Sequence, residues 1–261
     1  MNHLIEFENV VQRFRIIRER PDTLREAFSK LFRHREPGFY DFQALKGVSF
    51  RIGAGESVGI IGRNGSGKST LLKIIAGVYQ PSSGKVTVRG KVAALIELAA
   101  GFHPELTGRE NIVLNGLLLG LTRREIREKE DAILEFAGVG DFIDSPVKQY
   151  SSGMFMRLGF AVAVQVEPEI LLMDEIFSVG DAAFQMKCLQ RIDEFRDQGR
   201  TTVLVSHSMA AVRLHCRRVL LIDRGKLVAD GTPDEVIPQY YQLQGELEGA
   251  LTGSAQILEE S

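Results

Sequence analysis

The sequence contains no tryptophan, only two cysteines, and no hydrophobic run long enough to cross a membrane. Cys188 and Cys216 have no CxxC partner and no histidine at metal-ligand spacing, which excludes a zinc motif and a disulfide framework. The longest apolar stretch, residues 112–121, is far shorter than the roughly 20 residues that a bilayer-crossing helix requires. The first residues also lack the basic segment and apolar core of a secretory signal peptide. We therefore expect a cytosolic chain that takes any membrane role from a partner.

A surplus of charge of either sign is also missing. The sequence has 32 lysines and arginines against 34 aspartates and glutamates, for a formal net charge of −2. Nucleic-acid binding generally needs a broad excess of basic residues to displace counterions from phosphates, so we expect no nucleic-acid partner. The length of 261 residues, with 44% hydrophobic and 25% charged residues, is typical of one large α/β domain or two intimate subdomains.

The order of strand-like and helix-like segments predicts a parallel sheet with crossover helices. Residues 4–17 and 45–62 have strand patterns, residues 106–165 are mostly helical, and strands alternate with helices from residue 169 onward. Between the first two strand segments, residues 22–36 carry apolar side chains at helical spacing. This spacing predicts an inserted amphipathic helix.

A glycine-rich loop follows the apolar strand of residues 57–61. Residues 62–70 read GRNGSGKST and match the phosphate-loop pattern G-x-x-x-x-G-K-[ST] between a strand and a helix. The glycines let backbone N–H groups point at phosphate oxygens, and the following helix presents its positive end to the same anion. Lys68 is expected to reach the β- and γ-phosphates of a nucleotide, and Ser69 to ligate Mg²⁺. The predicted nucleotide-binding residues of the loop are Gly62, Arg63, Asn64, Gly65, Ser66, Gly67, Lys68, Ser69 and Thr70.

Two acidic residues end the buried-strand run that begins at residue 170. Asp174 lies at the carboxyl edge where α/β sheets place ligands, and it suits a metal ligand, directly or through water. Glu175 suits a different task, the polarisation of an attacking water. Two acids could instead cap the next helix, but the phosphate loop upstream weakens that alternative.

Three further motifs occur in a fixed order. Residues 150–154 read YSSGM, Asp181 ends the run Ser-Val-Gly-Asp, and His207 follows the apolar strand TTVLV. Together with the phosphate loop and the acid pair, this set resembles an ABC ATPase. YSSGM resembles the family's signature, most often LSGGQ, with Ser151 and Gly153 at its two most informative positions. It departs from LSGGQ at the first, third and fifth positions, in a spelling similar to that of the polysaccharide and teichoic-acid export branch.

The resemblance implies an architecture. It covers residues 4 to about 243 and implies an α/β P-loop NTPase of the ABC type, with a RecA-like core sheet, an antiparallel β subdomain and an inserted helical subdomain. We expect the nucleotide-binding domain to span residues 1–243, with the helical subdomain at about 104–166 and the inserted helix at about 22–36. We expect residues 244–261 to form a flexible tail or the start of a missing domain.

The resemblance also implies roles for the motif residues. The signature residues Ser151, Ser152 and Gly153 would bind the γ-phosphate of an ATP held by the phosphate loop of another subunit. This implies a homodimer with ATP and Mg²⁺ at its interface. Asp181 would contact the opposite subunit. His207 would contact the γ-phosphate and act with Glu175 in ATP hydrolysis.

Two positions of the family pattern have no clear counterpart. The family carries a Gln in the loop before its helical subdomain, but no Gln occurs between residues 81 and 148. Glu97 is the nearest polar substitute and takes that place in our prediction, next to the metal, although it could equally be a buried acid paired with an arginine. The adenine-stacking aromatic should end the first strand, which makes Phe14 the first choice and Tyr40 or Phe42 the alternatives. A plain core phenylalanine fits position 14 equally well.

By resemblance, the chain is an ATPase subunit that powers export of a lipid-linked polysaccharide: O-antigen, capsule or teichoic acid. It would act at the cytoplasmic face of the cell membrane, bound to an integral membrane transport subunit. An ABC ATPase of another transporter class and a soluble, non-transport ABC ATPase are the alternatives. Soluble members in repair and chromosome organisation carry long coiled-coil insertions, which the short sequence separation of Lys68 and Ser151 does not allow. Members in translation carry two ATPase domains, which the single set of motifs does not fit. A regulatory subunit with little turnover is disfavoured by the presence of Glu175 and His207.

The inserted segment 22–36 carries a surplus of basic side chains, and we hypothesise that it lies near the membrane interface. Anionic headgroups or a lipid-linked pyrophosphate would attract it there, whereas the alternative is docking of its apolar face on the sheet. Replacing Arg25, Lys30, Arg33 and Arg35 by Gln in the assembled transporter is expected to lower export and the ATPase response to substrate. Unchanged export together with an unchanged ATPase response would contradict the hypothesis.

Overall fold

The computed structural model describes residues 3–17, 39–95, 101–174 and 181–245. The predicted inserted helix, Glu97 and Glu175 lie outside these ranges, as does most of the predicted tail. Within them, no helix is long and apolar enough to cross a membrane. The two cysteines are buried, and burial raises the pKa of each thiol to about 12.

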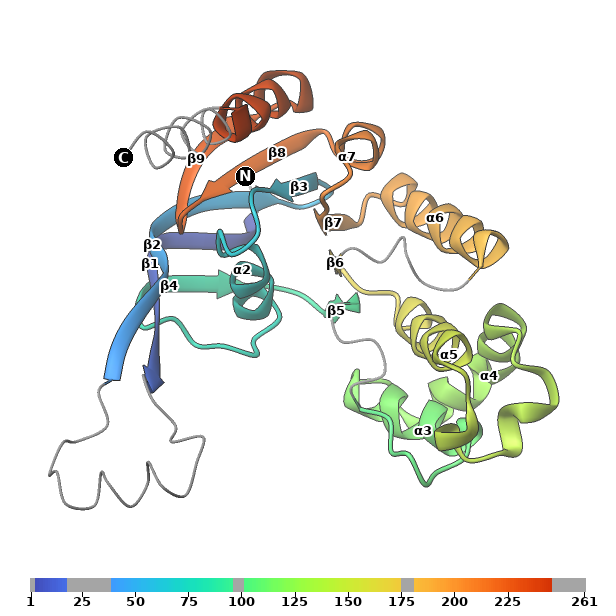
Figure 1. The fold of residues 1–261 in the computed structure, drawn as a ribbon. Coiled ribbons are helices and arrows are strands. Elements are labelled where there is room, and N and C mark those ends of the chain that lie inside the picture. Colours follow the sequence, from blue (N-terminus) through green and yellow to red (C-terminus); the bar gives the residue numbers. More distant parts are fainter. Residues whose placement is uncertain (1–2, 18–38, 96–100, 175–180, 246–261) are drawn as a thin grey trace, which may run out of the picture.

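Two sheets form most of the body of the molecule (Figure 1). The smaller is antiparallel, with the order β2-β1-β4, and the larger has the order β5-β6-β7-β3-β8-β9. In the larger sheet only the pair β8–β9 is antiparallel. The strands are β1 (His3–Ile17), β2 (Phe39–Gly53), β3 (Ser57–Ile61), β4 (Ser83–Val88), β5 (Val92–Ala94), β6 (Ile170–Asp174), β7 (Thr201–Val205), β8 (Arg218–Asp223) and β9 (Lys226–Gly231).

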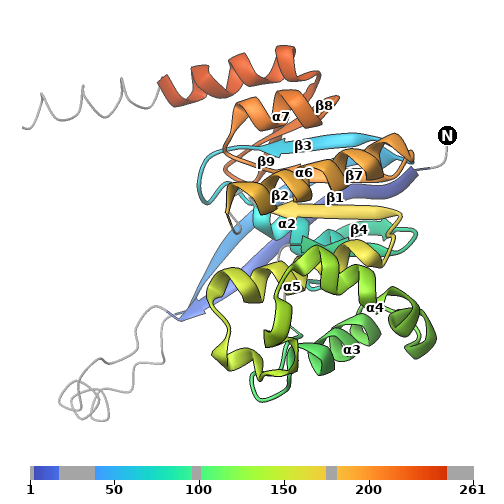
Figure 2. The same ribbon diagram turned by 90° about the vertical axis from the view of Figure 1, so that its right-hand side faces the viewer.

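The central strands of the larger sheet are buried on both faces. Every residue of β3 and β7 is buried, which is why these strands read as continuous apolar runs instead of alternating ones. One face packs against α2 (Lys68–Ile75) and the antiparallel sheet. The other packs against α6 (Ala182–Asp197), α7 (Met209–His215) and the helical residues 233–245 (Figure 2). We call this layered part the core lobe.

The remaining helices form a second group at one side of the core lobe (Figure 1). They are α3 (Gly108–Leu118), α4 (Arg123–Ala137) and α5 (Ser152–Gln165), with the 3-10 turns η2 (Gly140–Asp144) and η3 (Val147–Gln149) between α4 and α5. Both α3 and α4 begin with a capping box, because a threonine and a glutamate three residues later bond each other's backbone N–H. These helices share their own buried cluster, and we call them the helical lobe.

Parallel pairing brings three strand ends to one edge of the larger sheet. Ile60 of β3 pairs with Val205 of β7, and Asp174 of β6 pairs with the same residue from the other side. Since β3, β6 and β7 run parallel, their carboxyl ends lie next to one another. The phosphate loop follows β3, Asp174 ends β6, and His207 follows β7.

Candidate active site

A cavity of about 370 Å³ opens at this edge of the sheet. Its lining includes Lys68 and Ser69 from the start of α2, Asp174 from the end of β6 and His207 from the segment after β7. The structure therefore brings together candidates that are far apart in the sequence and were singled out by separate motifs. The complete lining is Asn64, Gly65, Lys68, Ser69, Asp174, Val205 and His207.

The path of the phosphate loop depends on two glycines. Gly62 has φ +152°, and a Cβ added there would lie 2.0 Å from the Ile222 carbonyl oxygen. Gly67 has φ +112°, and its added Cβ would lie 2.8 Å from the Ala44 carbonyl oxygen. No residue with a side chain fits either position without displacing backbone, so this path requires glycine at both.

The loop and the start of α2 present hydrogen-bond donors. Gly67 caps α2 without a side-chain hydrogen bond, and the first turn carries no acidic residue, so helix N–H groups remain for an anion. The buried Lys68 ammonium donates to the Gly62 and Arg63 carbonyl oxygens at 2.8 and 2.9 Å. The Ser66 hydroxyl is also buried and finds no hydrogen-bond partner within the described ranges. A bound phosphate would supply an acceptor for the Ser66 hydroxyl.

The chemistry of Ser69 and Asp174 fits Mg²⁺. Both place oxygen ligands on the cavity, and Mg²⁺ is commonly held by one or two such ligands together with substrate phosphates and water. Over the described part of the chain, no group of three or more His, Cys, Asp or Glu is placed to hold a metal. Ser69 and Asp174 could thus hold Mg²⁺ together with the phosphate oxygens of a bound nucleotide.

A hairpin turn that the sequence reading missed supports the phosphate loop. The N–H of Gly225, between β8 and β9, donates to the Ser66 carbonyl oxygen at 2.9 Å, and the Gly225 carbonyl accepts from Lys46 N at 2.8 Å. Arg224 and Gly225 both have positive φ, as two-residue hairpin turns require. The glycine between two apolar strands was a signal for the turn, but nothing local indicated its contact with the phosphate loop.

The signature residues do not reach this cavity. Ser151 caps α5 by accepting a hydrogen bond from Met154 N at 3.2 Å, and both Ser151 and Ser152 are exposed on the helical lobe. A Cβ added at Gly153 would meet only the Ser151 hydroxyl, at 3.8 Å. The packing of the described residues therefore gives no reason for glycine at position 153.

Asp181 joins the two lobes of one chain. Its Oδ1 caps α6 by accepting from Phe184 N at 2.9 Å, and its Oδ2 accepts from the Arg157 guanidinium of α5 at 2.6 Å. The hydrogen bond from Phe184 N holds the pKa of Asp181 below its usual value, with help from Arg157. The carboxylate is thus charged at neutral pH, and these contacts weaken only when acid protonates it. The sequence predicted that Asp181 contacts the opposite subunit, which stays a prediction. It did not predict the contact with Arg157.

Phe14 lies in β1 opposite Phe42 of β2. Its half-buried ring meets Tyr79, which follows α2, edge to face at 5.4 Å between centroids. Tyr40 and Phe42 are more exposed, at 46% and 45%. All three remain candidates for the adenine-stacking role.

Comparison with known proteins agrees with these motifs. Residues 45–178 match the sequence profile of the family described as ABC transporter. Over 201 residues, the chain is 51% identical to the O-antigen export system ATP-binding protein RfbB of Klebsiella pneumoniae, covering 77% of this chain and 82% of that protein. The chain belongs to the ABC transporter family. Family membership makes it an ABC ATPase that binds ATP, as the motifs predicted.

A second relative within the ABC family is longer than this chain. The teichoic acids export ATP-binding protein TagH of Bacillus cereus is 43% identical over 240 residues, which are 92% of this chain and 43% of that protein. The chain therefore spans less than half the length of that relative.

Solved ABC structures share the fold. A structure described as the ATP binding subunit of an ABC transporter has a TM-score of 0.71 at 23% identity, covering 91% of this chain and 93% of that one. The ATP-binding cassette MJ0796, in a dimeric post-hydrolysis state bound to ADP and Pi, has a TM-score of 0.68 at 23% identity, covering 88% and 98%. The predicted fold class, an ABC-type P-loop NTPase, is confirmed.

Gly67→Ala is expected to weaken ATP binding by at least about 10-fold, because the added methyl group must displace the phosphate loop from Ala44. Gly77→Ala is the matched control: its φ of +76° is also left-handed, but no atom lies within 4 Å of its added Cβ. Titration with a fluorescent ATP analogue measures both affinities. Equal affinities of the two variants would contradict this account of the loop.

Proposed function

We propose that two copies of this chain form the ATP-hydrolysing part of a transporter that exports a lipid-linked polysaccharide such as O-antigen, capsule or teichoic acid. One observation carries the proposal for two copies: Lys68 lines the cavity of the core lobe, whereas the signature serine, Ser151, lies exposed on the helical lobe. In a dimer of antiparallel copies, the Ser151 of each copy would contact the nucleotide bound by the other copy. Such reciprocal contacts are those of an isologous dimer.

In the proposed site, the phosphate loop and Lys68 hold the triphosphate. Ser69 and Asp174 would hold Mg²⁺, which neutralises charge on the phosphate oxygens when bound. Glu175, which follows Asp174 in the sequence, polarises the attacking water, and His207 orients it at the γ-phosphate. Phe14 stacks on adenine. Glu97, outside the described residues, stays a proposed neighbour of the metal.

The dimer provides the mechanical step. Ser151 and Gly153 of one copy contact the γ-phosphate held by Lys68 of the other, so ATP stabilises the closed dimer over the separated copies. Hydrolysis removes that γ-phosphate, and the copies separate. This cycle would move an integral membrane subunit, to which the chain binds at the cytoplasmic face of the membrane.

The polysaccharide substrate is inferred from relatives. The Klebsiella and Bacillus proteins are named for O-antigen and teichoic acid export. The YSSGM spelling of the signature supports the same branch. We therefore propose a lipid-linked polysaccharide as the cargo of the assembled transporter.

Glu175→Gln is expected to trap an ATP-bound dimer, because the amide cannot polarise the attacking water while the phosphate-binding groups remain. Size-exclusion chromatography with ATP and Mg²⁺ should show a dimer for this variant, and phosphate release should fall by about 10²-fold or more. A purely monomeric elution with full hydrolysis would show that the role given to Glu175 is wrong.

Gly153→Ala is expected to abolish ATP-dependent dimer formation without loss of stability. Among the described residues, the new methyl group meets no atom closer than 3.8 Å, and alanine in a helix is favoured over glycine by up to about 1 kcal/mol. It would, however, fill the space through which a partner's γ-phosphate approaches. Gly245→Ala, also helical with nothing within 4 Å of its added Cβ, is the control and should dimerise normally. Dimer formation by both variants would argue against a γ-phosphate at Gly153.

A further inference from the structure

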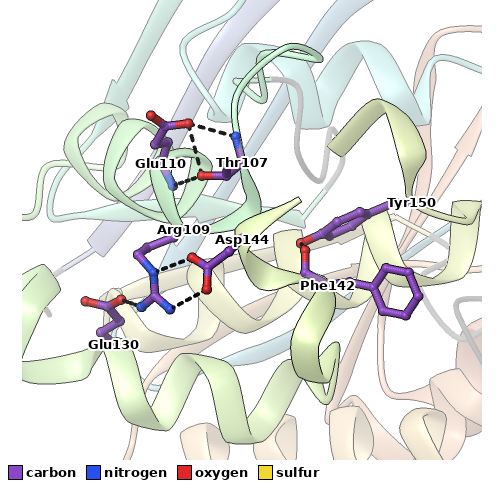
Figure 3. Close-up of polar contacts among 7 residues, drawn as sticks. All are labelled: Thr107, Arg109, Glu110, Glu130, Phe142, Asp144 and Tyr150. Carbon is purple, nitrogen blue, oxygen red and sulfur yellow. Dashed lines mark hydrogen bonds and ion pairs between the residues drawn. The ribbon is translucent and has the colours of Figure 1, made fainter. Parts of the chain in front are cut away.

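Tyr150 occupies the first signature position, where the ABC family most often has leucine. Its hydroxyl donates a hydrogen bond to the Phe142 carbonyl oxygen at 2.7 Å, across the loop that leads into α5 (Figure 3). Its half-buried ring packs against the hydrophobic cluster of the helical lobe. Burial and the nearby charge of Asp144 raise the pKa of the hydroxyl, so it keeps its proton and remains a donor. A leucine could fill the same apolar space but could not make this bond.

The hydroxyl of Tyr150 also lies against the first residue of α3. A Cβ added at Gly108 would stand 2.2 Å from the Tyr150 oxygen, so the tyrosine fits only because position 108 is glycine. The Gly108 N–H donates to the Ser145 carbonyl oxygen at 3.2 Å. The residue before Ser151 is therefore in close contact with the N-terminus of a different helix.

An ion pair joins the start of α3 to the segment before Ser151, one residue further along α3 than Gly108. The Arg109 guanidinium donates to both carboxylate oxygens of Asp144, at 2.9 and 3.3 Å, and also to Glu130 of α4 (Figure 3). The hydrogen bond from Arg109 lowers the pKa of Asp144, so the pair persists at neutral pH. A two-oxygen contact of this kind fixes direction as well as distance.

Backbone contacts continue the attachment up to the signature. Val147 N donates to the Leu106 carbonyl oxygen at 3.0 Å, and Lys148 N donates to the Pro104 carbonyl oxygen at 3.1 Å. The Lys148 ammonium pairs with Glu105 at 2.6 Å. Residues 142–150 are thus bound along their length to residues 104–109, which lie just before α3 and in its first two positions.

We propose that Tyr150 is a positioning residue, whose hydroxyl together with the Arg109–Asp144 pair sets Ser151 relative to the start of α3. A displacement of residues 104–109 against the core lobe would then carry Ser151 toward or away from the nucleotide of a second copy. This inference rests on the proposed function, because Ser151 meets a phosphate only in the dimer. The inference gives a physical role to Tyr150, which takes the place of the leucine most often found at the first signature position.

The test uses Tyr150→Phe, which removes only the hydroxyl, in the Glu175→Gln chain. We expect the ATP concentration for half-maximal dimer formation to rise by about 3- to 10-fold, a loss the size of one hydrogen bond. ATP binding by the separated chain, measured with a fluorescent analogue, should stay unchanged, because the phosphate loop is untouched. The melting temperature should fall by no more than the roughly 2 to 4 °C that the loss of one hydrogen bond gives in a chain of this size, because the apolar packing is kept. Tyr241→Phe, at an exposed position on the C-terminal helical segment, is the matched control. It should change neither the ATP requirement for dimer formation, nor ATP binding, nor the melting temperature.

Asp144→Asn gives a second variant at the same attachment. It should raise the ATP requirement for dimer formation in the same direction, and the double variant should raise it by less than the product of the two single effects. An unchanged ATP requirement in Tyr150→Phe would overturn the inference while leaving the dimer intact. A fall in melting temperature well beyond that of one lost hydrogen bond would overturn it too, since that result indicates a general loss of structure in the helical lobe. Failure of the parent Glu175→Gln chain to dimerise would instead count against the proposed function.

Discussion

The negative charge of a bound triphosphate is the constraint on which the arrangement of this chain depends. Such a group needs cationic and N–H donors on more than one side, and one chain presents its candidate donors on two different lobes. Lys68 and the start of α2 belong to the core lobe, and the start of α5 belongs to the helical lobe. The proposed dimer satisfies the constraint, because each copy completes the site of the other.

The helix α5 carries the signature and also anchors it. Its first residues are exposed, whereas Phe160 and its neighbours are fully buried. The Phe160 ring stacks on Phe136 of α4 and meets Phe184 of α6 edge to face, so α5 packs against both lobes. The Arg157–Asp181 ion pair and the Tyr150 hydroxyl hold the exposed end. The signature is therefore attached to a buried part of α5, while Ser151 and Ser152 stay exposed.

Local motifs predicted the main parts of the candidate site. Lys68, Asp174 and His207 were each found from a few neighbouring residues, because a phosphate loop or a strand end has a sequence pattern of its own, and the cavity brings all three together. The fold class followed from the family resemblance that these motifs carried. The assignments of Glu175, Glu97 and the inserted helix stay predictions, since they lie outside the described residues.

Contacts between segments that are far apart in the chain could not be predicted from the sequence. β4 and β5 were not predicted: β4 is largely polar and exposed along its first half, and β5 has only three residues, so neither has a clear period. The contact of Gly225 with the phosphate loop, and that of Tyr150 with Gly108, depend on tertiary packing that no local pattern encodes. Arg157 was missed for the same reason, because its partner Asp181 lies on another helix.

A structure of the Glu175→Gln chain with ATP and Mg²⁺ tests the central claim most directly. The account predicts two copies in which the Lys68 ammonium of one and the Ser151 hydroxyl of the other lie within hydrogen-bonding distance of the same γ-phosphate. A nucleotide enclosed by a single copy, with Ser151 turned toward solvent in every assembly, would contradict it.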